Sequence, residues 1–359
     1  MTNIKILNYN VSNFAIQGKR RGVWAINPIY PRTPERFTFL SSYRDLGTGK
    51  PPNLYGSTDY QSEIPLDNIV DYLLAVYREY DIINLIEANQ DLINRLKYAI
   101  SSEGPNGEST HYILRFWEPT MTEALYLVIR KTLPLIDAFC LSMSSTINPK
   151  KKAIGIVVFE QFVFVGVHLM HPITESRDER LNVLEILKMS LMHIFNKLDQ
   201  MAIIIGGDFN SEEPLTQFYK NKQLWHNSPL DLKTAYTMVK SHYFKTEGER
   251  PLQFAYDRFC WTPKVKVTEL PEIDWSSENR HLHLTGQMSD HLPVEATFKV
   301  PTKSGFDPTN YNEFFLLRDH YFTETQTIEH GAYIMDFYPF GVDQPNLEDN
   351  TYTRIFDKH

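Results

Sequence analysis

The chain has 359 residues, of which 42% are hydrophobic and 22% charged, with a formal net charge of −8. This length suits one large α/β domain with additions or two small domains, and the apolar content is sufficient for a folded interior. The acidic balance argues against a protein that coats nucleic acid by bulk electrostatics, although a bound Mg²⁺ and a local basic patch would still allow a nuclease.

The two cysteines, Cys140 and Cys260, both lie in apolar or aromatic surroundings, which favours buried thiols over a disulfide. The N-terminus enters an apolar strand without the basic leader and small-residue cleavage site of a signal peptide. No window approaches the roughly 18 consecutive apolar residues of a membrane span. We therefore expect a soluble protein in a reducing compartment such as the cytoplasm, the alternative being secretion without a leader.

An N-terminal strand ends at Asn10, and a polar, proline-bearing segment from about 12 to 65 follows it as an insertion, a candidate surface for substrate entry or a protein partner. Periodicity then predicts helices over 68–80, 90–100 and 177–198. Strands are predicted over 112–116, 125–130, 136–141, 154–159 and 162–168. Residues 301–359 are rich in Tyr and Phe but weakly periodic, which predicts an extension packed on the domain or used as a partner surface.

The most informative stretch is AIIIGGDFNSEEP, from Ala202 to Pro214, where an apolar strand enters a glycine turn. Asp208 and Asn210 lie two positions apart at the carboxyl end of that strand, so they point the same way and offer one charged and one neutral oxygen ligand. The alternative is an ordinary surface turn, because Gly, Asp and Asn are the usual turn residues.

Polar side chains also end or follow other apolar runs, which favours the interpretation as a metal site. They are Asn10, Glu87, His168 with His171 just beyond it, Asp257 among aromatic residues, and the pair Asp290 and His291. A buried carboxylate such as Glu87 is costly without a partner, so it is usually paired or bound to a cation. The alternatives are a strand-end hydrogen bond for Asn10, a core position for His168 and an ion pair with Arg258 for Asp257.

In this order the clusters resemble the endonuclease/exonuclease/phosphatase superfamily, over Ile4 to roughly Val300. The resemblance implies an α/β (α+β) fold of the deoxyribonuclease I-like type, a four-layered sandwich of two packed mixed β-sheets flanked by helices. It places the domain at residues 1–300, ahead of the 301–359 extension. It also implies a phosphoesterase that depends on Mg²⁺, with Mn²⁺ as a possible substitute.

The resemblance further implies a role for each polar residue. Glu87 would be the principal metal ligand, helped by Asn10, Asp208 or Asp290. His291 would take the proton from the attacking water while Asp257 holds its ring. His168 would protonate the leaving oxygen or hydrogen-bond the phosphate, and Asn210 would orient the phosphate or the nucleophile.

A finer resemblance concerns TEALYLVIRKTLPLIDAF, which looks like the strand of pancreatic-type deoxyribonucleases that carries a glutamate partner of the catalytic histidine. It implies that Glu123 hydrogen-bonds His168, the alternative being an exposed charge at a strand start. The sequence departs from the family at Ile86, where a glutamine usually precedes the metal glutamate.

Substrate class is less sharply indicated. GDFNSEEPLTQFY is similar to nucleases and deadenylases of the superfamily, whereas YDRFCW and SDHLPVEATF are similar to inositol polyphosphate 5-phosphatases and sphingomyelinases. We expect a phosphodiesterase, with nucleic acid favoured over a phosphoinositide or another phosphate ester. The alternative of a catalytically silent partner-binding protein is disfavoured because Glu87, Asp208 and His291 are all present.

Overall fold

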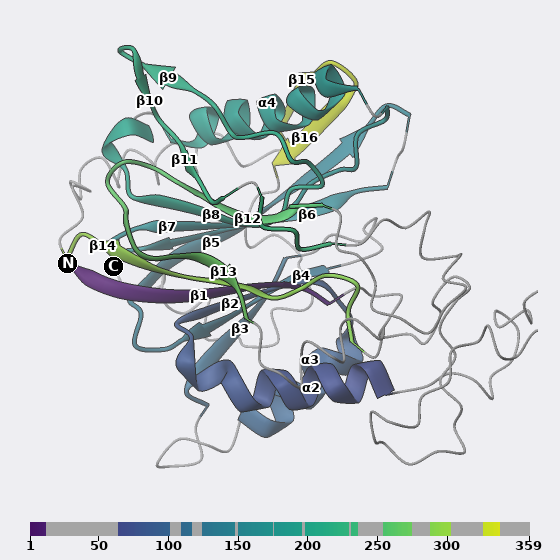
Figure 1. Ribbon diagram of the computed structural model, residues 1–359, viewed down its shortest axis with the longest axis vertical. Coiled ribbons are helices and arrows are strands. Elements are labelled where there is room, and N and C mark those ends of the chain that lie inside the picture. The colour runs from purple at the N-terminus through teal and green to yellow at the C-terminus, as the bar shows by residue number, and fades with distance from the viewer. Residues whose placement is uncertain are drawn as a thin grey trace, which may run out of the picture.

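The computed structural model describes residues 1–11, 64–100, 109–116, 124–147, 150–174, 176–195, 198–229, 231–235, 254–274, 288–302 and 326–337. These residues form two β-sheets packed face to face, with helices on both outer faces (Figure 1). The expected four-layered sandwich of two mixed sheets is therefore confirmed.

The six-stranded sheet has the order β13-β14-β1-β2-β4-β3. Its strands are β1 (Thr2–Asn10), β2 (Ile82–Ala88), β3 (His111–Phe116), β4 (Ala124–Arg130), β13 (Lys266–Ile273) and β14 (Val294–Val300). β1 pairs with β2 in parallel and with β14 antiparallel, so the start of the chain lies between strands that are far apart in sequence.

The eight-stranded sheet has the order β11-β12-β8-β7-β6-β5-β16-β15. Its strands are β5 (Leu135–Ser145), β6 (Lys152–Phe159), β7 (Val163–His168), β8 (Ile203–Asp208), β11 (His226–Asn227), β12 (Asp257–Trp261), β15 (Gln326–His330) and β16 (Tyr333–Phe337). β7 and β8 are parallel, with His168 opposite Asp208. A separate two-stranded ladder joins β9 (Phe218–Tyr219) to β10 (Lys222–Gln223).

The described part of the 301–359 extension contains the hairpin β15–β16. β16 pairs antiparallel with β5, with Tyr333 opposite Ser145, and so extends the eight-stranded sheet. The residues on either side of this hairpin, and most of the predicted 12–65 insertion, lie outside the described residues. The domain boundaries at 300 and the role of the insertion stay predictions.

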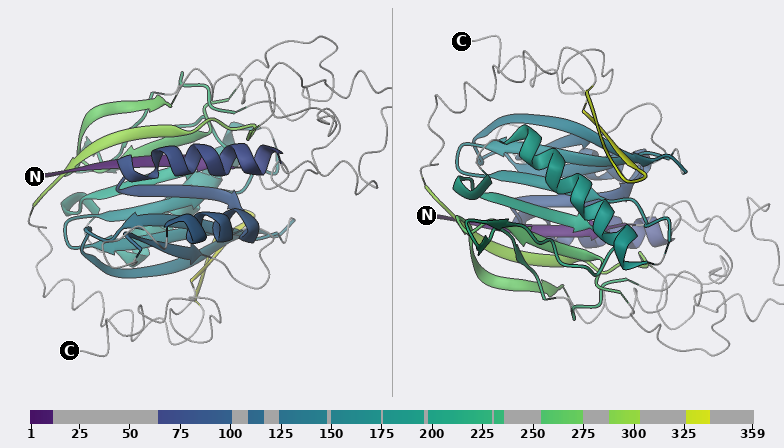
Figure 2. Two further views of the ribbon diagram at one scale, coloured as in Figure 1. Left: turned by 90° about the horizontal axis from the view of Figure 1, so that it is seen from below. Right: turned by 90° about the horizontal axis from the view of Figure 1, so that it is seen from above.

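In the part of the chain that the structure describes, the helices cover the outer face of each sheet (Figure 2). Helix α2 (Ile64–Val76), the short helix η4 (Tyr77–Glu79) and helix α3 (Gln90–Ile100) pack on the outer face of the six-stranded sheet, whereas α4 (Arg177–Ile194), followed by η5 (Leu198–Gln200), packs on the eight-stranded sheet. α4 starts where the Ser176 side chain accepts a hydrogen bond from the Glu179 amide, and it buries Leu184, Leu187 and Leu191. The predicted helices are present, with α2 beginning earlier and α4 ending earlier than expected.

Strand alternation decides which side chains enter the space between the sheets. Apolar side chains such as Ile6, Phe164 and Ile204 fill most of this space. Toward the ends of β1, β7 and β8, the same inward-facing rows continue with polar residues or glycine, and they finish at Asn10, His168 and Asp208. Burial of these three side chains therefore follows from the architecture.

Cys140 and Cys260 are free and buried, as expected. Among the described residues, none of the helices has the length and apolar character needed to cross a membrane.

Candidate active site

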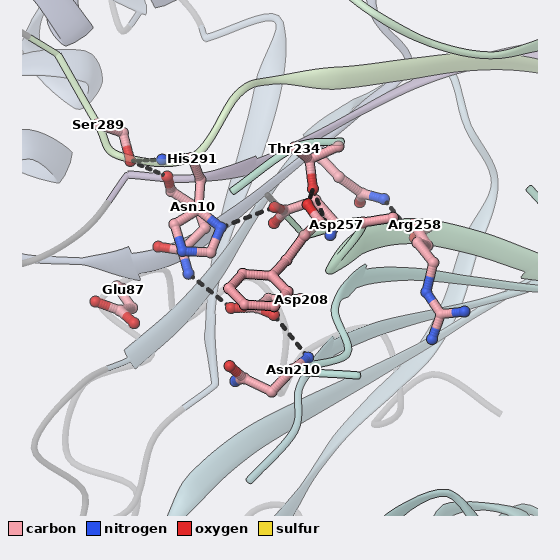
Figure 3. A network of polar contacts seen from close by, with 12 residues as sticks. Asn10, Glu87, Asp208, Asn210, Thr234, Asp257, Arg258, Ser289 and His291 are labelled. Atoms are coloured by element: carbon pink, nitrogen blue, oxygen red, sulfur yellow. Dashed lines mark hydrogen bonds and ion pairs between the residues drawn. The ribbon is translucent and has the colours of Figure 1, made fainter. Parts of the chain in front are cut away.

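Asp208 and Asn10 meet between the two sheets at the ends of β8 and β1. The Nδ2 atom of Asn10 donates a hydrogen bond to Oδ2 of Asp208 at 3.0 Å. The backbone N–H of Asn210 donates to Oδ1 of Asp208 at 2.8 Å (Figure 3). Asp208 is 1% exposed, and in the described part of the chain no Lys or Arg forms an ion pair with it. A buried carboxylate in such surroundings is suited to a bound cation.

The turn after β8 is held in shape by backbone geometry. Gly207 has φ of 144°, and a Cβ there would lie 2.0 Å from the carbonyl oxygen of Val167, so this position requires glycine. Asn210 has φ of 47°, in the left-handed region that asparagine tolerates, and its Nδ2 donates to the carbonyl of Leu169 at 2.8 Å. The motif does form a turn, but Asp208 is 1% exposed and Phe209 is wholly buried, so the alternative of an ordinary surface turn is wrong.

His291 and Asp257 form a buried pair beside Asp208. The Nδ1 atom of His291 lies 2.7 Å from Oδ2 of Asp257, and Asp257 lies opposite Asp208 in the β8–β12 ladder. The Asp257 amide donates to Oγ1 of Thr234 at 2.9 Å. The Ser289 hydroxyl accepts a hydrogen bond from the backbone N–H of His291 at 3.1 Å and donates one to the backbone carbonyl of Asn10. These two bonds connect the loop that carries His291 to β1 (Figure 3).

The protonation of this pair follows from its surroundings. Burial lowers the pKa of His291, but the charge of Asp257 and its hydrogen bond outweigh burial and raise that pKa to about 10. Burial raises the pKa of Asp257 to about 6, against the opposing effect of His291. Between these two values the pair is an imidazolium hydrogen-bonded to a carboxylate.

Glu87 reaches the site through a break in strand alternation. Ile86 faces the other sheet and Leu85 faces the helices, so regular alternation would turn Glu87 outward. Instead, the β2–β4 register shifts between Leu85 and Ala88, Glu87 takes φ of 58°, and Ala88 packs against the helices. Oε1 of Glu87 then lies 3.4 Å from Nε2 of His168. This left-handed conformation costs roughly 1–3 kcal/mol and is typical of functional sites.

His168 joins Glu87 to Asp208. Its Nε2 atom lies 3.4 Å from Oε1 of Glu87 and 3.9 Å from Oδ2 of Asp208, and the side chain is almost wholly buried. Burial, with smaller effects of the Lys152 and His291 charges, lowers the pKa of His168 well below its usual value. A neutral ring of this kind can donate a hydrogen bond but is a poor proton donor. Of the two predicted roles of His168, this favours a hydrogen bond to the phosphate over protonation of the leaving oxygen.

Comparison with solved structures agrees with this architecture. TDP2 from C. elegans aligns over 82% of this chain and 75% of its own, at 12% identity and a TM-score of 0.51. A second structure of TDP2 from Caenorhabditis elegans gives 83% and 74% coverage, 11% identity and a TM-score of 0.50. The chain has a deoxyribonuclease I-like fold.

The human Nocturnin catalytic domain with a bound sulfate anion aligns at 15% identity and a TM-score of 0.48, over 83% of this chain and 95% of its own. No family model and no curated protein matches the sequence. At 11–12% identity to the TDP2 structures, the deoxyribonuclease I-like similarity is one of fold alone.

The deoxyribonuclease I-like architecture brings most of the predicted site residues together. Asn10, Glu87, His168, Asp208, Asn210, Asp257 and His291 are linked by the contacts given above or lie beside one another in the same ladder. Asp290 precedes His291 in the same loop, and its charge contributes to the raised pKa of that ring. Glu123 lies outside the described residues, so its bond to His168 stays a prediction. Among the described residues, the carboxylates near His168 belong to Glu87 and Asp208.

Several supporting residues were not predicted. Thr234 and Ser289 hold the His291–Asp257 pair, and nothing in their sequence surroundings distinguishes them from other small polar residues. Asn8 and Asn84 lie just below the site and are wholly buried. An amide inside an otherwise apolar strand was a signal that could have identified both, because buried polar groups need partners.

Asp208, Asp257 and His291 offer ligand atoms that all lie within 4.8 Å of one another. This group differs from the predicted metal ligands. Because His291 and Asp257 already share a 2.7 Å hydrogen bond, we favour the oxygen donors of Glu87, Asn10 and Asp208 for a cation. Two carboxylates and an amide are hard oxygen donors, which fits Mg²⁺ or Mn²⁺.

Proposed function

We propose that this chain is a metal-dependent phosphoesterase that hydrolyses phosphodiester bonds in nucleic acid. The observation that carries the proposal is the convergence of a buried carboxylate, Asp208, with a buried imidazole–carboxylate pair, His291 and Asp257. A cation held by carboxylates, beside a histidine that can accept a proton, supplies both charge stabilisation and general-base catalysis for the hydrolysis of a phosphate ester.

Glu87, Asn10 and Asp208 would hold the divalent cation, and Asp290 of the 288–291 loop is a further candidate ligand. When bound, the cation draws negative charge from a phosphate oxygen and stabilises the transition state. The 1% exposure of Asp208 supports this assignment, because a carboxylate this deeply buried needs cationic partners, and no Lys or Arg among the described residues forms an ion pair with it.

His291 would accept the proton of the attacking water. Asp257 engages Nδ1, which leaves Nε2 as the accepting atom and keeps the ring in one orientation. With its raised pKa the ring is mostly protonated at neutral pH, so only the deprotonated fraction can accept a proton, and this fraction grows as the pH rises toward about 10. His168, with its lowered pKa, would donate a hydrogen bond to the phosphate, and Asn210 would help to orient it.

Nucleic acid is the proposed substrate class because the sequence from Gly207 to Tyr219 is similar to nucleases and deadenylases of the superfamily. The net charge of −8 requires that binding of a polyanion depends on the cation and on local charges rather than on the whole molecule.

The test is a comparison of plasmid DNA, single-stranded RNA, phosphoinositide vesicles and bis(4-nitrophenyl) phosphate, each with Mg²⁺ and with EDTA. The expected result is Mg²⁺-dependent cleavage of nucleic acid that is lost in Asp208→Asn and kept in Thr262→Val, a buried control at the other end of β8. If inorganic phosphate is released from the phosphoinositide vesicles and no other substrate is cleaved, phosphoinositides replace nucleic acid as the proposed substrate class. No cleavage of any substrate by the folded protein would overturn the proposed function and favour partner binding.

A further inference from the structure

Two asparagines, Asn8 of β1 and Asn84 of β2, are wholly buried between the sheets. They lie opposite each other in the parallel β1–β2 ladder, and Nδ2 of Asn84 donates to Oδ1 of Asn8 at 3.1 Å. We refer to these two side chains as the amide layer.

The amide layer joins one sheet to the other. Nδ2 of Asn84 also donates to the carbonyl of Gly206 in β8 at 2.9 Å, and Nδ2 of Asn8 donates to the carbonyl of Arg258 in β12 at 3.2 Å. Each asparagine thus contacts backbone of the eight-stranded sheet. Hydrogen bonds are directional, whereas the apolar contacts around them tolerate sliding of one sheet over the other.

The facing strands have glycine where the amides need room. A Cβ at Gly206 would lie 2.7 Å from both Oδ1 and Nδ2 of Asn8, and a Cβ at Gly166 would lie 3.0 Å from Oδ1 of Asn84. Both glycines belong to inward-facing rows that are otherwise filled by side chains such as Phe164 and Ile204. The amides and the glycines therefore fit one another as a set.

The site lies one inward-facing position beyond the amide layer on several strands. Asn10 follows Asn8 by two residues, Asp208 follows Gly206 by two, and His168 follows Gly166 by two. Two residues of a strand span about 6.6 Å. Asp257 precedes Arg258, whose carbonyl accepts from Asn8. A displacement of the amide layer would consequently move residues that have to converge from both sheets.

Stability alone does not explain this arrangement. The Oδ1 atom of Asn84 is buried and has no hydrogen-bond partner among the described residues, so the pair carries an uncompensated desolvation cost. An apolar pair of similar shape would avoid that cost and keep the packing. The presence of two amides at these positions is explained if they hold the two sheets in one register.

From these contacts we infer that Asn8 and Asn84 are positioning residues that fix the two sheets in register so that the site residues converge. The inference rests on the proposed function for its catalytic consequence, but its geometric content is independent of activity. Neither side chain is assigned any contact with substrate or cation.

The test compares Asn8→Leu and Asn84→Leu, which keep a branched side chain at Cγ but cannot form these hydrogen bonds. Asn8→Ser and Asn84→Ser, smaller and still polar, serve if the leucine variants do not fold. Thr262→Val is the matched control, because Thr262 is also buried and its hydroxyl accepts a hydrogen bond from the backbone amide of Ile203, at the other end of β8, and donates one to the carbonyl of Met201 just before that strand. Unfolding free energy is measured for all variants, so that any loss of function is compared at known stability.

Two readouts separate positioning from folding. The first is kcat and KM on the cleaved phosphodiester; we expect kcat to fall about 10²-fold in the leucine variants, as for a small misplacement, with KM little changed and the control unaffected. The second is the proton NMR resonance of the His291 Nδ1–H that bonds Asp257, which should shift or broaden in the same variants and stay unchanged in Thr262→Val.

Wild-type kcat together with an unshifted His291 resonance in a folded leucine variant would overturn the inference. An equal loss in Thr262→Val at equal stability would also overturn it, because the effect would then be general destabilisation. If the wild-type protein cleaves no substrate, the proposed function fails on its own, and the His291 resonance still decides whether the amide layer positions the site.

Discussion

The Nδ1 atom of His291 lies 2.7 Å from Oδ2 of Asp257, although 34 residues separate them in the chain. Asp257→Asn would keep the size of the side chain but offer an amide where the ring needs an acceptor, which disfavours the tautomer that can take a proton at Nε2. Turnover should fall by about 10²–10⁴-fold in Asp257→Asn and in His291→Ala. Steady-state kinetics checks this, and a rate near that of the wild type in either folded variant would remove the pair from the mechanism.

The same pair predicts a pH dependence of stability. The pKa of His291 is raised from an ordinary 6.5 to about 10 in the folded protein, so its stabilising effect is fully present below about 6.5 and is lost as pH rises through about 10. Between pH 7 and 10 the unfolding free energy should therefore fall more steeply in the wild type than in His291→Gln/Asp257→Asn. Denaturant titrations across this range measure both slopes, and equal slopes would contradict the assigned pairing.

Glu87 provides a test that separates stability from activity, because two variants should lose activity alike and differ in stability. Because Glu87 has φ of 58°, replacing it with glycine should relieve a backbone cost that glutamine retains. Glu87→Gly should be about 1 kcal/mol more stable than Glu87→Gln by chemical denaturation, while both lose Mg²⁺-dependent turnover. A glycine variant that is no more stable than the glutamine variant would show that the bend at this residue stores no strain.

A divalent cation should stabilise the folded chain, because the ligand groups converge only in that state. At a Mg²⁺ concentration 100 times the Kd, the gain in unfolding free energy is about 2.7 kcal/mol. The thermal midpoint of the wild type should rise with Mg²⁺ and return with EDTA, and it should respond weakly in Asp208→Asn. Equal shifts in the wild type and Asp208→Asn would indicate binding elsewhere on the protein.

Much of the fold and the site could be predicted because the relevant signals are local. Apolar periodicity indicated α3 over its observed range, and polar residues at the ends of apolar runs indicated Asn10, His168 and Asp208. A sheet edge brings such strand ends together whatever the loops between them.

The remaining features depend on contacts between distant segments or on backbone conformation. The inward turn of Glu87 requires a register shift and a positive φ, and neither can be predicted from the residue types in β2. The hydrogen bonds of Asn84 depend on how the two sheets face each other. The hairpin β15–β16 has weak periodicity because it is defined by its pairing with β5 at the sheet edge.

The most direct measurement is anomalous diffraction from crystals of the protein soaked in Mn²⁺. The central claim is that oxygen donors from both sheets converge on one divalent cation, so a single strong peak should lie within coordination distance of the Glu87 carboxylate and next to Asp208 and Asn10. The peak should be absent from crystals of Glu87→Gln/Asp208→Asn. A fully occupied Mn²⁺ far from these residues, with none between the sheets at saturating concentration, would contradict the account.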